Sequence, residues 1–407
     1  MAHFVKHLLD STLVSRFQNS CGLFATEPDG FPPKKQDSES TSSRGVRSES
    51  NTRNGFSGNG TGASEQPRSN AKRTHDVSGR VVKSSSPKYV VKNYFLYYLF
   101  RFAAALGQEV FYITFLPCTH WNMNPFLCRR LVNMWAVIMY IGQVTKDLLK
   151  WPRPFSPPVV KLEPRVDAEY GMPSTHAMAA TSISFTFLLS TMDRYQYPFE
   201  LGLMAAILFS TLVCLSRLYV GMHSVLDVIC GVLIAGVVMA ITYPVWDTFD
   251  HLQVTSPYSP IIAVVLPYLM SHFYPRLDHY STTRGDTTII LGSAAGCSIG
   301  YWVNHQLGET YEPTGGFPLA IPAMTLAVVV YSCVRFAIGI AFLVVTRQVM
   351  KSLSLFVLCS WFQVSKEDRK ARQRLEIEVP YKFVTYSAVG ITSTVLVHKT
   401  LIILGLF

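Results

Sequence analysis

Long apolar stretches, separated by short polar breaks, fill the chain from about residue 94 onward. A helix needs about 20 mostly apolar residues to cross a bilayer, and stretches of that kind predict nine helices. They lie near residues 94–116, 131–149, 175–192, 199–216, 225–243, 259–275, 287–304, 320–345 and 384–406. The polar breaks are too short for a separate soluble domain. We therefore expect an all-α fold, a polytopic transmembrane helical bundle.

The N-terminal part of the chain follows other patterns. Within residues 1–26, apolar side chains such as Phe4 and Leu8 recur at helical spacing and predict a short amphipathic helix. This helix either lies on the membrane or docks on a partner, and an ordinary capped helix explains the pattern equally well. Residues 27–86 are rich in Ser, Thr, Asn, Gly, Pro and Arg, so they cannot offset their ordering entropy. We expect a disordered tail there, followed by a membrane domain over residues 87–407.

Composition and charge agree with a membrane protein. Hydrophobic residues make up 49% of the 407 residues and charged residues 15%, which is too apolar for an ordinary soluble enzyme. The net charge of +10 comes from Lys and Arg in the tail, the loops and residues 347–382, an arrangement that suits membrane lipids with anionic headgroups better than nucleic acid. The eight cysteines show no CxxC or other ligand spacing, so we expect no disulfide framework.

Polar clusters interrupt the apolar pattern at three places, each at predicted helix ends. In the first, Lys146 closes one helix and Arg153 follows within an Arg-Pro pair, so both cations can converge on one dianion. In the second, Ser174, Thr175 and His176 begin a helix, where free backbone N–H groups and the helix dipole favour an anion. The Ser174 hydroxyl can donate to that anion, and a protonated His176 can donate to a leaving oxygen.

The third cluster joins the end of one predicted helix to the beginning of the next. Arg217 ends the first of these helices, and His223 and Asp227 follow it. If His223 opens the next helix, Asp227 lies one turn later on the same face, where its carboxylate can accept from one ring nitrogen. The other nitrogen is then free to act as a nucleophile. The sequence thus predicts catalytic residues His176, His223 and Asp227 and phosphate-binding residues Lys146, Arg153, Ser174, Thr175 and Arg217.

The three clusters have the order and spacing Lys-x6-Arg-Pro, Pro-Ser-x-His and Ser-Arg-x5-His. This pattern resembles the signature of the type 2 phosphatidic acid phosphatase and vanadium haloperoxidase superfamily. The wider stretches over residues 169–178 and 221–227 are similar to the sphingosine-1-phosphate phosphatases, and the likeness covers most of the chain outside residues 25–86. Thr175 stands where glycine is usual in the superfamily, but its backbone N–H can still donate, and the sphingosine phosphate branch carries the same residue.

The resemblance implies a metal-independent lipid phosphatase without a cofactor. Its substrates would be sphingosine-1-phosphate and dihydrosphingosine-1-phosphate, its products the sphingoid base and inorganic phosphate, and its catalytic core would cover about residues 131–243. It implies that His223 attacks phosphorus to form a phosphohistidine, and that His176 protonates the leaving alkoxide and then activates water. The cations, Ser174 and backbone N–H groups would stabilise charge on the equatorial oxygens.

Other interpretations of these residues stay open. The chain can be a broader lipid-phosphate phosphatase, or a lipid transporter or scaffold with a disabled site, although the intact motifs argue against the second. A zinc site at His176, His223 and Asp227 lacks the short spacing that is typical of zinc ligands. An acid near the site, Glu109 or Glu169, is a hypothetical receptor for the ammonium group of a sphingoid base.

The side of the membrane on which the site lies is predicted in two conflicting ways. Nine crossings place the N-terminal tail, the catalytic loops and the basic residues 346–383 on one side, which the positive-inside rule assigns to the cytosol. The resemblance implies a multi-pass protein of the endoplasmic reticulum membrane with its site toward the lumen. Glycosylation of the sequon Asn59-Gly60-Thr61 would show that the N-terminal tail lies in the lumen, because this modification occurs only there. No pattern in the sequence indicates an oligomeric state.

Overall fold

The fold was analysed in a computed structural model. It describes residues 2–26, 74–75, 81–82, 89–163, 169–310, 316–321 and 323–406. The chain divides into two units, one made of Met1–Ala25 and Tyr89–Phe407 and the other of Thr26–Lys88. In the smaller unit, strands β2 (Thr74–His75) and β3 (Val81–Val82) pair antiparallel. The rest of the predicted disordered tail, with its sequon, lies outside the described residues.

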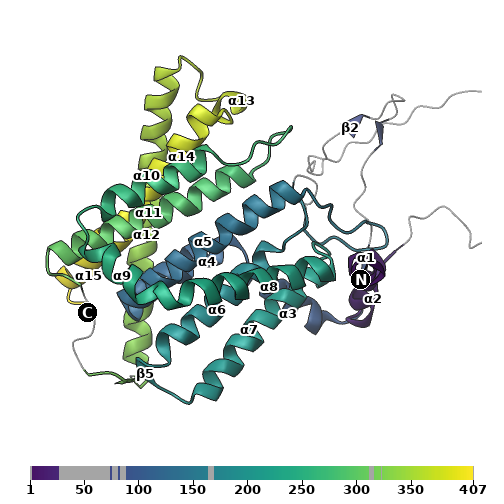
Figure 1. The fold of residues 1–407 in the computed structure, drawn as a ribbon, viewed down its shortest axis with the longest axis horizontal. Helices are drawn as coiled ribbons and strands as arrows, with labels where there is room; N and C mark the ends of the chain where they lie inside the picture. Colours follow the sequence, from purple (N-terminus) through teal and green to yellow (C-terminus); the bar gives the residue numbers. More distant parts are fainter. Residues whose placement is uncertain are drawn as a thin grey trace, which may run out of the picture. The chain divides into compact units, whose positions relative to one another are not determined.

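The larger unit is built almost entirely of α-helices (Figure 1), which confirms the predicted all-α fold. Its helices are α1 (Ala2–Leu9), α2 (Ser11–Ser20), α3 (Tyr94–Leu106), α4 (Glu109–Asn122), α5 (Pro125–Leu149), α6 (Thr175–Thr191), α7 (Phe199–Tyr219), α8 (Val225–Thr242), α9 (Trp246–Thr255), α10 (Ser259–His272), α11 (Thr283–Gln306), α12 (Leu326–Trp361), α13 (Arg369–Arg372), α14 (Leu375–Ile391) and α15 (Val397–Ile403). A 3-10 turn, Tyr243–Val245, joins α8 to α9, and a π-helical segment, Thr392–Leu396, joins α14 to α15. Strand β1 (Leu23–Ala25) pairs antiparallel with β4 (Tyr89–Val91), and β5 (Tyr195–Gln196) pairs parallel with β6 (Leu319–Ala320).

Helices occupy all nine predicted ranges, but fewer than nine of them are marked as membrane spans by length and hydropathy. Within the described residues four qualify, namely Phe199–Tyr219, Val225–Thr255, Leu326–Trp361 and Leu375–Ile403. The first predicted span is broken into α3 and α4, which are bent by 66° and make a fifth span if they are taken together. Helices α5 and α11 are more polar and α6 is shorter. The multi-pass membrane architecture is therefore confirmed, whereas nine equivalent spans are not found.

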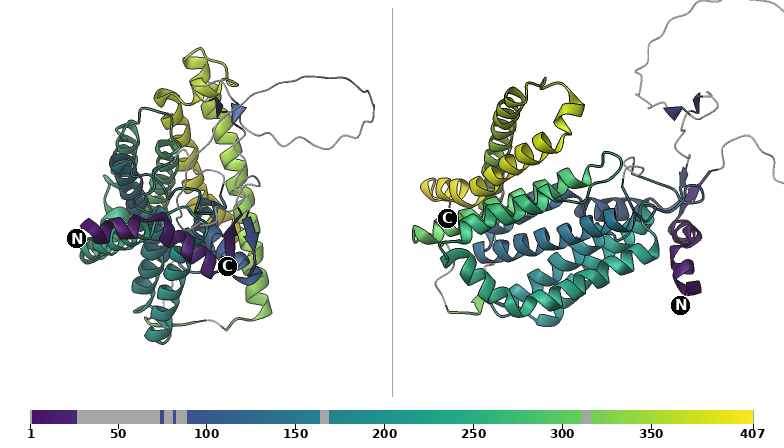
Figure 2. Two further views of the ribbon diagram at one scale, coloured as in Figure 1. Left: turned by 90° about the vertical axis from the view of Figure 1, so that its right-hand side faces the viewer. Right: turned by 45° about the horizontal axis from the view of Figure 1, so that its top comes forward.

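Helix α5 lies at the centre of the bundle and supplies much of its apolar core. Leu131, Trp135 and Ile138 on this helix are buried and pack with residues of α4, α6 and α11. Figure 1 shows α6, α7 and α8 on one side of α5 and α10, α11 and α14 on the other. In the second view of Figure 2, α12 and α14 form an antiparallel pair that is inclined to the other helices. The core thus depends on one helix whose two ends remain available for polar groups.

Those two ends carry separate polar clusters. Arg130, near the start of α5, pairs with Asp250 at 2.5 Å and with Asp247 on α9. Lys146 lies in the last turn of α5. A helix rises about 1.5 Å per residue, so these two cations are about 24 Å apart along the axis. The chemistry predicted for Lys146 therefore belongs to one end of the bundle.

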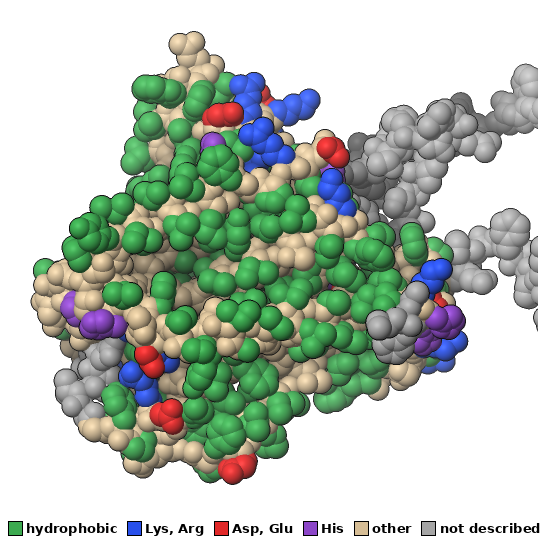
Figure 3. Space-filling view, viewed as in Figure 1, with side chains coloured by type: hydrophobic (Ala, Val, Ile, Leu, Met, Phe, Trp, Pro, Cys, Tyr) green, Lys and Arg blue, Asp and Glu red, His purple; other side chains and the backbone are tan. Residues whose placement is uncertain are grey.

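Large apolar side chains cover much of the outer surface (Figure 3). On α8, Leu233 is 61% exposed and Ile241 70%, and on α10 Ile261 is 62% exposed. A soluble monomer rarely exposes apolar patches on this scale, whereas side chains that face lipid tails are expected to be apolar. The outward faces of these helices therefore mark the part of the bundle that lies in the bilayer.

The N-terminal segment forms two helices where one was predicted. They separate at Asp10, whose side chain accepts a hydrogen bond from Thr12 N at 2.9 Å and caps α2. Val14 and Gln18 on α2 are buried, and Phe17 packs with Phe100 of α3 and with the end of α7. The inner face of α2 therefore packs on the same chain.

Candidate active site

The helix ends predicted to carry the site meet at one end of the bundle. Lys146 lies in the last turn of α5 and Arg217 in the last turn of α7, and they are only 2% and 1% exposed. Ser174 caps α6, and His223 lies in the loop just before α8. The rings of His176 and His223 are within electrostatic range of each other and of the predicted cations. The structure thus brings together Lys146, Arg153, Ser174, Thr175, His176, Arg217, His223 and Asp227.

Arg217 is held by a carboxylate that the sequence motifs do not include. Its Nη1 and Nη2 donate to Oε1 and Oε2 of Glu163, each at 3.2 Å. This two-pronged geometry is the one in which a guanidinium binds a carboxylate or a phosphate. The Nε of Arg217 is buried without a hydrogen-bond partner among the described residues. Glu163 therefore occupies the donors that a substrate phosphate would use.

A second carboxylate, that of Glu169, neutralises the other two cations. Its Oε2 lies 3.7 Å from Nζ of Lys146 and 3.3 Å from Nη2 of Arg153. The ammonium of Lys146 also lies 3.4 Å from Oγ1 of Thr175 at the start of α6. We call Lys146, Arg153 and Arg217 the cation cradle. In the structure each of its members is paired with a glutamate, so a bound phosphate must compete with carboxylates of the protein itself.

Arg153 also ties together the loops that form the cation cradle. Its Nε donates to the backbone carbonyl of Glu169 at 3.0 Å, and its Nη1 donates to that of Met222 at 3.1 Å. These bonds join the beginning of the loop between α5 and α6 to the end of the same loop and to the loop that precedes α8. Because a guanidinium has several donors in a rigid plane, one side chain fixes three segments. Arg153 therefore positions the site as well as contributing charge.

Ser174 and Thr175 differ from the prediction in how they use their polar groups. The Ser174 hydroxyl accepts from Ala177 N at 3.4 Å as the cap of α6, and its backbone N–H donates to the carbonyl of Asp227 at 3.0 Å. That N–H is therefore not free for an anion, because it links α6 to α8. The side chain of Thr175, from which only a backbone donor was expected, contacts Lys146. The positive end of α6 still faces the cation cradle.

The predicted hydrogen bond between His223 and Asp227 is not formed. Nδ1 of His223 lies 3.6 Å from Oδ2 of Asp227, which is too long for such a bond. The Asp227 Oδ2 instead accepts from Ser224 N at 2.7 Å, while the Ser224 hydroxyl accepts from Asp227 N, so the pair forms a capping box that begins α8. His223 thus precedes the helix, after a turn in which Gly221 has a φ of 72°. The carboxylate remains an electrostatic neighbour of the ring.

His223 lies in a buried, cationic environment. Burial lowers the pKa of His223 well below the usual value for histidine, and Arg153, Arg217 and Lys146 lower it further, while a hydrogen bond with the backbone of Gly171 acts in the opposite direction. Burial and nearby positive charge both disfavour the protonated form. A histidine is neutral above its pKa, so His223 is neutral near pH 7. A ring nitrogen therefore keeps the lone pair that a nucleophile needs.

His176, on the first turn of α6, lies beside the break between α3 and α4. Gly107 follows α3 at this break, and a Cβ atom there would lie 2.8 Å from Cδ2 of His176 and 3.2 Å from Cγ1 of Val213. A side chain at position 107 would therefore push the imidazole out of its place. The glycine allows the backbone to approach the ring closely.

The N-terminal helix α2 supports the loops of the site from outside. Gln18 is 1% exposed, and its Nε2 donates to the carbonyls of Val160 and Tyr219 at 2.7 and 2.8 Å. Its Oε1 accepts from Val160 N at 2.9 Å. Val160 lies in the loop that contains Arg153, and Tyr219 ends α7 two residues after Arg217. A single glutamine amide thus joins the segments that carry two cations of the cradle.

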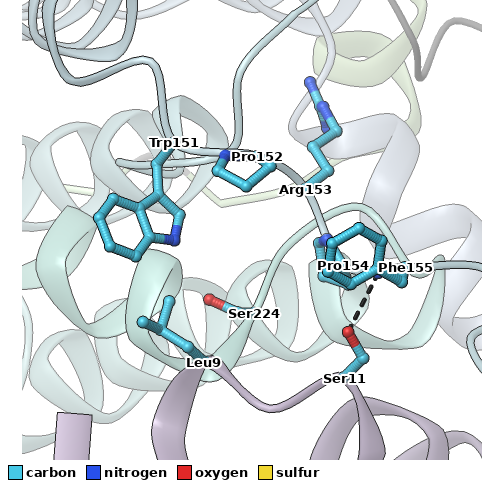
Figure 4. A pocket seen from close by; sticks show the side chains of 8 residues that line it. All are labelled: Leu9, Ser11, Trp151, Pro152, Arg153, Pro154, Phe155 and Ser224. Carbon is cyan, nitrogen blue, oxygen red and sulfur yellow. Dashed lines mark hydrogen bonds between the residues drawn. The ribbon is translucent and has the colours of Figure 1, made fainter. Parts of the chain in front are cut away.

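A second contact of the N-terminal helices is visible at the loop after α5. Ser11 accepts a hydrogen bond from Phe155 N at 3.0 Å (Figure 4). Beside it lies a cavity of about 270 Å³ that is also lined by Leu9, Trp151 and Arg153. Figure 4 shows the Arg153 side chain extending away from Leu9 and Ser11. The cavity therefore lies behind the loop and is not the place where the cation cradle binds an anion.

Replacing Gln18 with alanine is expected to destabilise the protein by about 1–3 kcal/mol, because it leaves buried backbone groups of Val160 and Tyr219 without hydrogen bonds. Thermal unfolding of the purified protein in detergent measures the loss as a lower midpoint temperature. Ser11→Ala is the control, since it removes one bond at an exposed position. Equal midpoints for the two variants would show that the Gln18 bonds do not hold the loops.

The sequence did not single out Glu163, Gln18 or Gly107. Glu163 and Glu169 both belong to the segment between the first two motifs, but nothing local marks Glu163 as the partner of Arg217. The alternative of a zinc site gains no support, because the described residues contain no group of three or more His, Cys, Asp or Glu side chains that could hold a metal ion. The chemistry of the site is therefore derived from its cations and its two histidines.

Comparison with known proteins places the site in a family. The PAP2 superfamily model matches residues 128–250. The chain is 51% identical over 413 residues to sphingosine-1-phosphate phosphatase 2 of Homo sapiens, with 100% of each chain covered. It is 44% identical over 318 residues to sphingosine-1-phosphate phosphatase 1 of Rattus norvegicus, covering 78% of this chain and 74% of the relative. It is 33% identical over 221 residues to a dihydrosphingosine 1-phosphate phosphatase of Schizosaccharomyces pombe, covering 52% and 53%. No solved structure matches.

These matches agree with the geometry. The region of the superfamily model contains all eight residues of the predicted site. The human relative is matched from end to end, so the similarity extends beyond the catalytic segment to the N-terminal and C-terminal parts of the chain. The resemblance inferred from the three motifs is confirmed. The chain belongs to the sphingosine-1-phosphate phosphatase family within the PAP2 superfamily, and it is a phosphatase.

Proposed function

We propose that this phosphatase hydrolyses sphingosine-1-phosphate and dihydrosphingosine-1-phosphate to the sphingoid base and inorganic phosphate. The observation that carries the proposal is a buried cradle of three cations beside a neutral histidine, His223. The relatives described above are named for sphingosine-1-phosphate or dihydrosphingosine 1-phosphate as substrate. The enzyme acts in the endoplasmic reticulum membrane, as the resemblance implies.

In the first step the substrate phosphate displaces the glutamates and is held by the cation cradle and by the N-terminus of α6. Nδ1 of His223 faces Asp227, so the other ring nitrogen, Nε2, attacks phosphorus. The N–P bond forms while the bond from phosphorus to the lipid oxygen breaks. The bound phosphate dianion favours the protonated form of His176, which gives its proton to this oxygen, so the lipid oxygen leaves as a hydroxyl group of the sphingoid base. The negative charge of Asp227 stabilises the imidazole ring as it becomes positive.

In the second step water removes the phosphoryl group from the histidine. His176, now neutral, accepts a proton from the water, whose oxygen bonds to phosphorus as the N–P bond breaks. Inorganic phosphate forms, and both histidines return to their starting protonation states. The cation cradle stabilises the equatorial oxygens in both steps. This sequence assigns no step to a metal ion.

Phosphate release by the purified protein, in vesicles and in excess chelator, tests the proposal. We expect sphingosine-1-phosphate and dihydrosphingosine-1-phosphate to be hydrolysed faster than ceramide-1-phosphate and phosphatidic acid. Equal rates for all four lipids would instead support a broader lipid-phosphate phosphatase. Loss of activity in chelator, with recovery when a divalent cation is added, would contradict the metal-independent mechanism.

A further inference from the structure

Glu169 contacts the cation cradle through one oxygen and faces a more open region with the other. Its Oε2 lies near Lys146 and Arg153, whereas its Oε1 accepts from the Thr282 hydroxyl at 3.4 Å. The Glu169 side chain is 26% exposed, but those of Lys146 and Arg153 are only 2% and 7% exposed. The carboxylate therefore lies at the edge of the phosphate site, where the part of a substrate next to the phosphate would lie.

We propose that Glu169 is a specificity-determining residue that receives the ammonium group of the sphingoid substrate. This inference rests on the proposed function. In a sphingoid base phosphate, the amino group is on the carbon next to the one that carries the phosphate ester. A phosphate held by Lys146 and Arg153 therefore brings the ammonium close to these cations. The carboxylate that already contacts both of them can accept a charge-assisted hydrogen bond from it.

The charge of the cradle makes such a carboxylate necessary. Three buried cations repel an incoming ammonium, and this repulsion is strong where little water screens it. Glu163 is less suited to offset it, because each of its two oxygens accepts from Arg217. The Oδ2 of Asp227 caps α8, and the side chain of Glu109 lies outside the described residues. Oδ1 of Asp227 has no hydrogen-bond partner among the described residues, but Asp227 is fully buried, whereas the Glu169 side chain is 26% exposed. Glu169 is therefore the carboxylate beside the cradle that an incoming ammonium can reach.

Two hydrogen bonds hold the backbone at Glu169 and Gly171, so the carboxylate stays beside the cradle when phosphate binds. The carbonyl of Glu169 accepts from Nε of Arg153 at 3.0 Å, and two residues later Gly171 N donates to the carbonyl of Trp151 at 2.6 Å. When phosphate takes up the charge of Lys146 and Arg153, their attraction for Oε2 weakens. The Glu169 carboxylate is then free to turn toward the ammonium without movement of the main chain.

Two substrates that differ in the charge of the amino group test this role. Sphingosine-1-phosphate carries an ammonium, whereas N-acetyl-sphingosine-1-phosphate has the same phosphate and a neutral amide. We measure kcat/KM for both with the purified full-length protein and take their ratio. Loss of one charge-assisted hydrogen bond is worth about tenfold or more, so Glu169→Gln should lower the preference for the charged substrate about tenfold. Glu169→Asp should retain part of the preference.

Glu163→Gln is the matched control, because it removes the other glutamate of the cradle and should change both substrates by the same factor. If Glu169→Gln slows both substrates equally and keeps their ratio, Glu169 only positions the cations and the inference is wrong. If Glu169→Gln does not fold, the ratio of kcat/KM for the two substrates is measured in Glu169→Asp instead, and an unchanged ratio there contradicts the inference. Failure of the unmodified enzyme to hydrolyse sphingosine-1-phosphate would overturn the proposed function itself, and with it this inference.

Discussion

Replacing His223 with alanine should reduce phosphate release from sphingosine-1-phosphate by about four orders of magnitude or more, as expected for the loss of a covalent nucleophile. His223 is the ring that burial and then the three cations keep neutral, and the cradle holds the phosphate beside it. Initial rates of phosphate release measure the effect. The unmodified enzyme, quenched in alkali during turnover of ³²P-labelled substrate, should contain a phosphohistidine, which the alanine variant should lack.

His251→Ala is the control for this experiment, because His251 is exposed on α9 with the polar cluster at the far end of α5. It should hydrolyse the lipid at the normal rate. Both variants should show the unfolding midpoint of the unmodified protein within a few degrees. Activity of the His223 variant within tenfold of normal would exclude this histidine as the nucleophile.

Replacing His176 with asparagine should lower the rate with the lipid substrate by about 10²- to 10⁴-fold, because the leaving alkoxide then departs without a proton. If a missing proton donor causes this loss of rate, the size of the loss should depend on the leaving group. p-Nitrophenolate is stable without protonation, so p-nitrophenyl phosphate should still phosphorylate His223 in this variant. Hydrolysis of the phosphohistidine should remain slow, because His176 also activates the water.

Rapid mixing of the His176→Asn variant with p-nitrophenyl phosphate should therefore show a burst of nitrophenol equal to the enzyme concentration, followed by a slow phase. The lipid substrate should show no burst. A second control is Gly107→Ala, whose added Cβ displaces the same ring without removing it and should lower the rate of the lipid reaction less. If the asparagine variant slows both substrates by the same factor without a burst, His176 is not the general acid.

The sequence was sufficient to predict the residues of the candidate site because their signals are local. A cation at the end of an apolar helix, or Pro-Ser-x-His at the beginning of one, is visible within a few positions. The all-α fold follows from the same contrast between apolar and polar segments. Lys146, Ser174, His176 and Arg217 were therefore assigned to helix ends, and the structure places each of them there.

The partners of these residues could not be predicted in the same way. Glu163 binds Arg217 across 54 residues of chain, and Gln18 binds Tyr219 across 201. No periodicity indicates such pairs, because they depend on how loops fold against one another. The hydrogen-bond partner of Asp227 could not be predicted for a different reason. Its spacing suits a bond to His223 and a capping box with Ser224 equally well, and the backbone donors at the start of α8 hold its carboxylate.

The number of predicted spans exceeds the number of described helices that pass the test of length and hydropathy, and the difference has a physical reason. An apolar stretch of sufficient length predicts a span, but α5 combines the apolar residues of the bundle core with charged residues near its ends, namely Arg129, Arg130, Lys146 and Asp147. The break at Gly107 was also missed, since Tyr94–Leu106 and the helix after it read as one apolar run. The glycine is required by the approach of the backbone to His176, which is a contact between segments that are distant in sequence.

The contacts of Gln18 have a consequence for how the enzyme meets its substrate. Because Gln18 binds the backbone at Val160 and Tyr219, the N-terminal helices lie at the same membrane face as the cation cradle. Arg284, which follows the Glu169 contact at Thr282, donates to the carbonyl of Gln373, so the turn before α14 belongs to this face too. We therefore expect the lipid substrate to enter from the leaflet at this end of the bundle, beside α1 and α2.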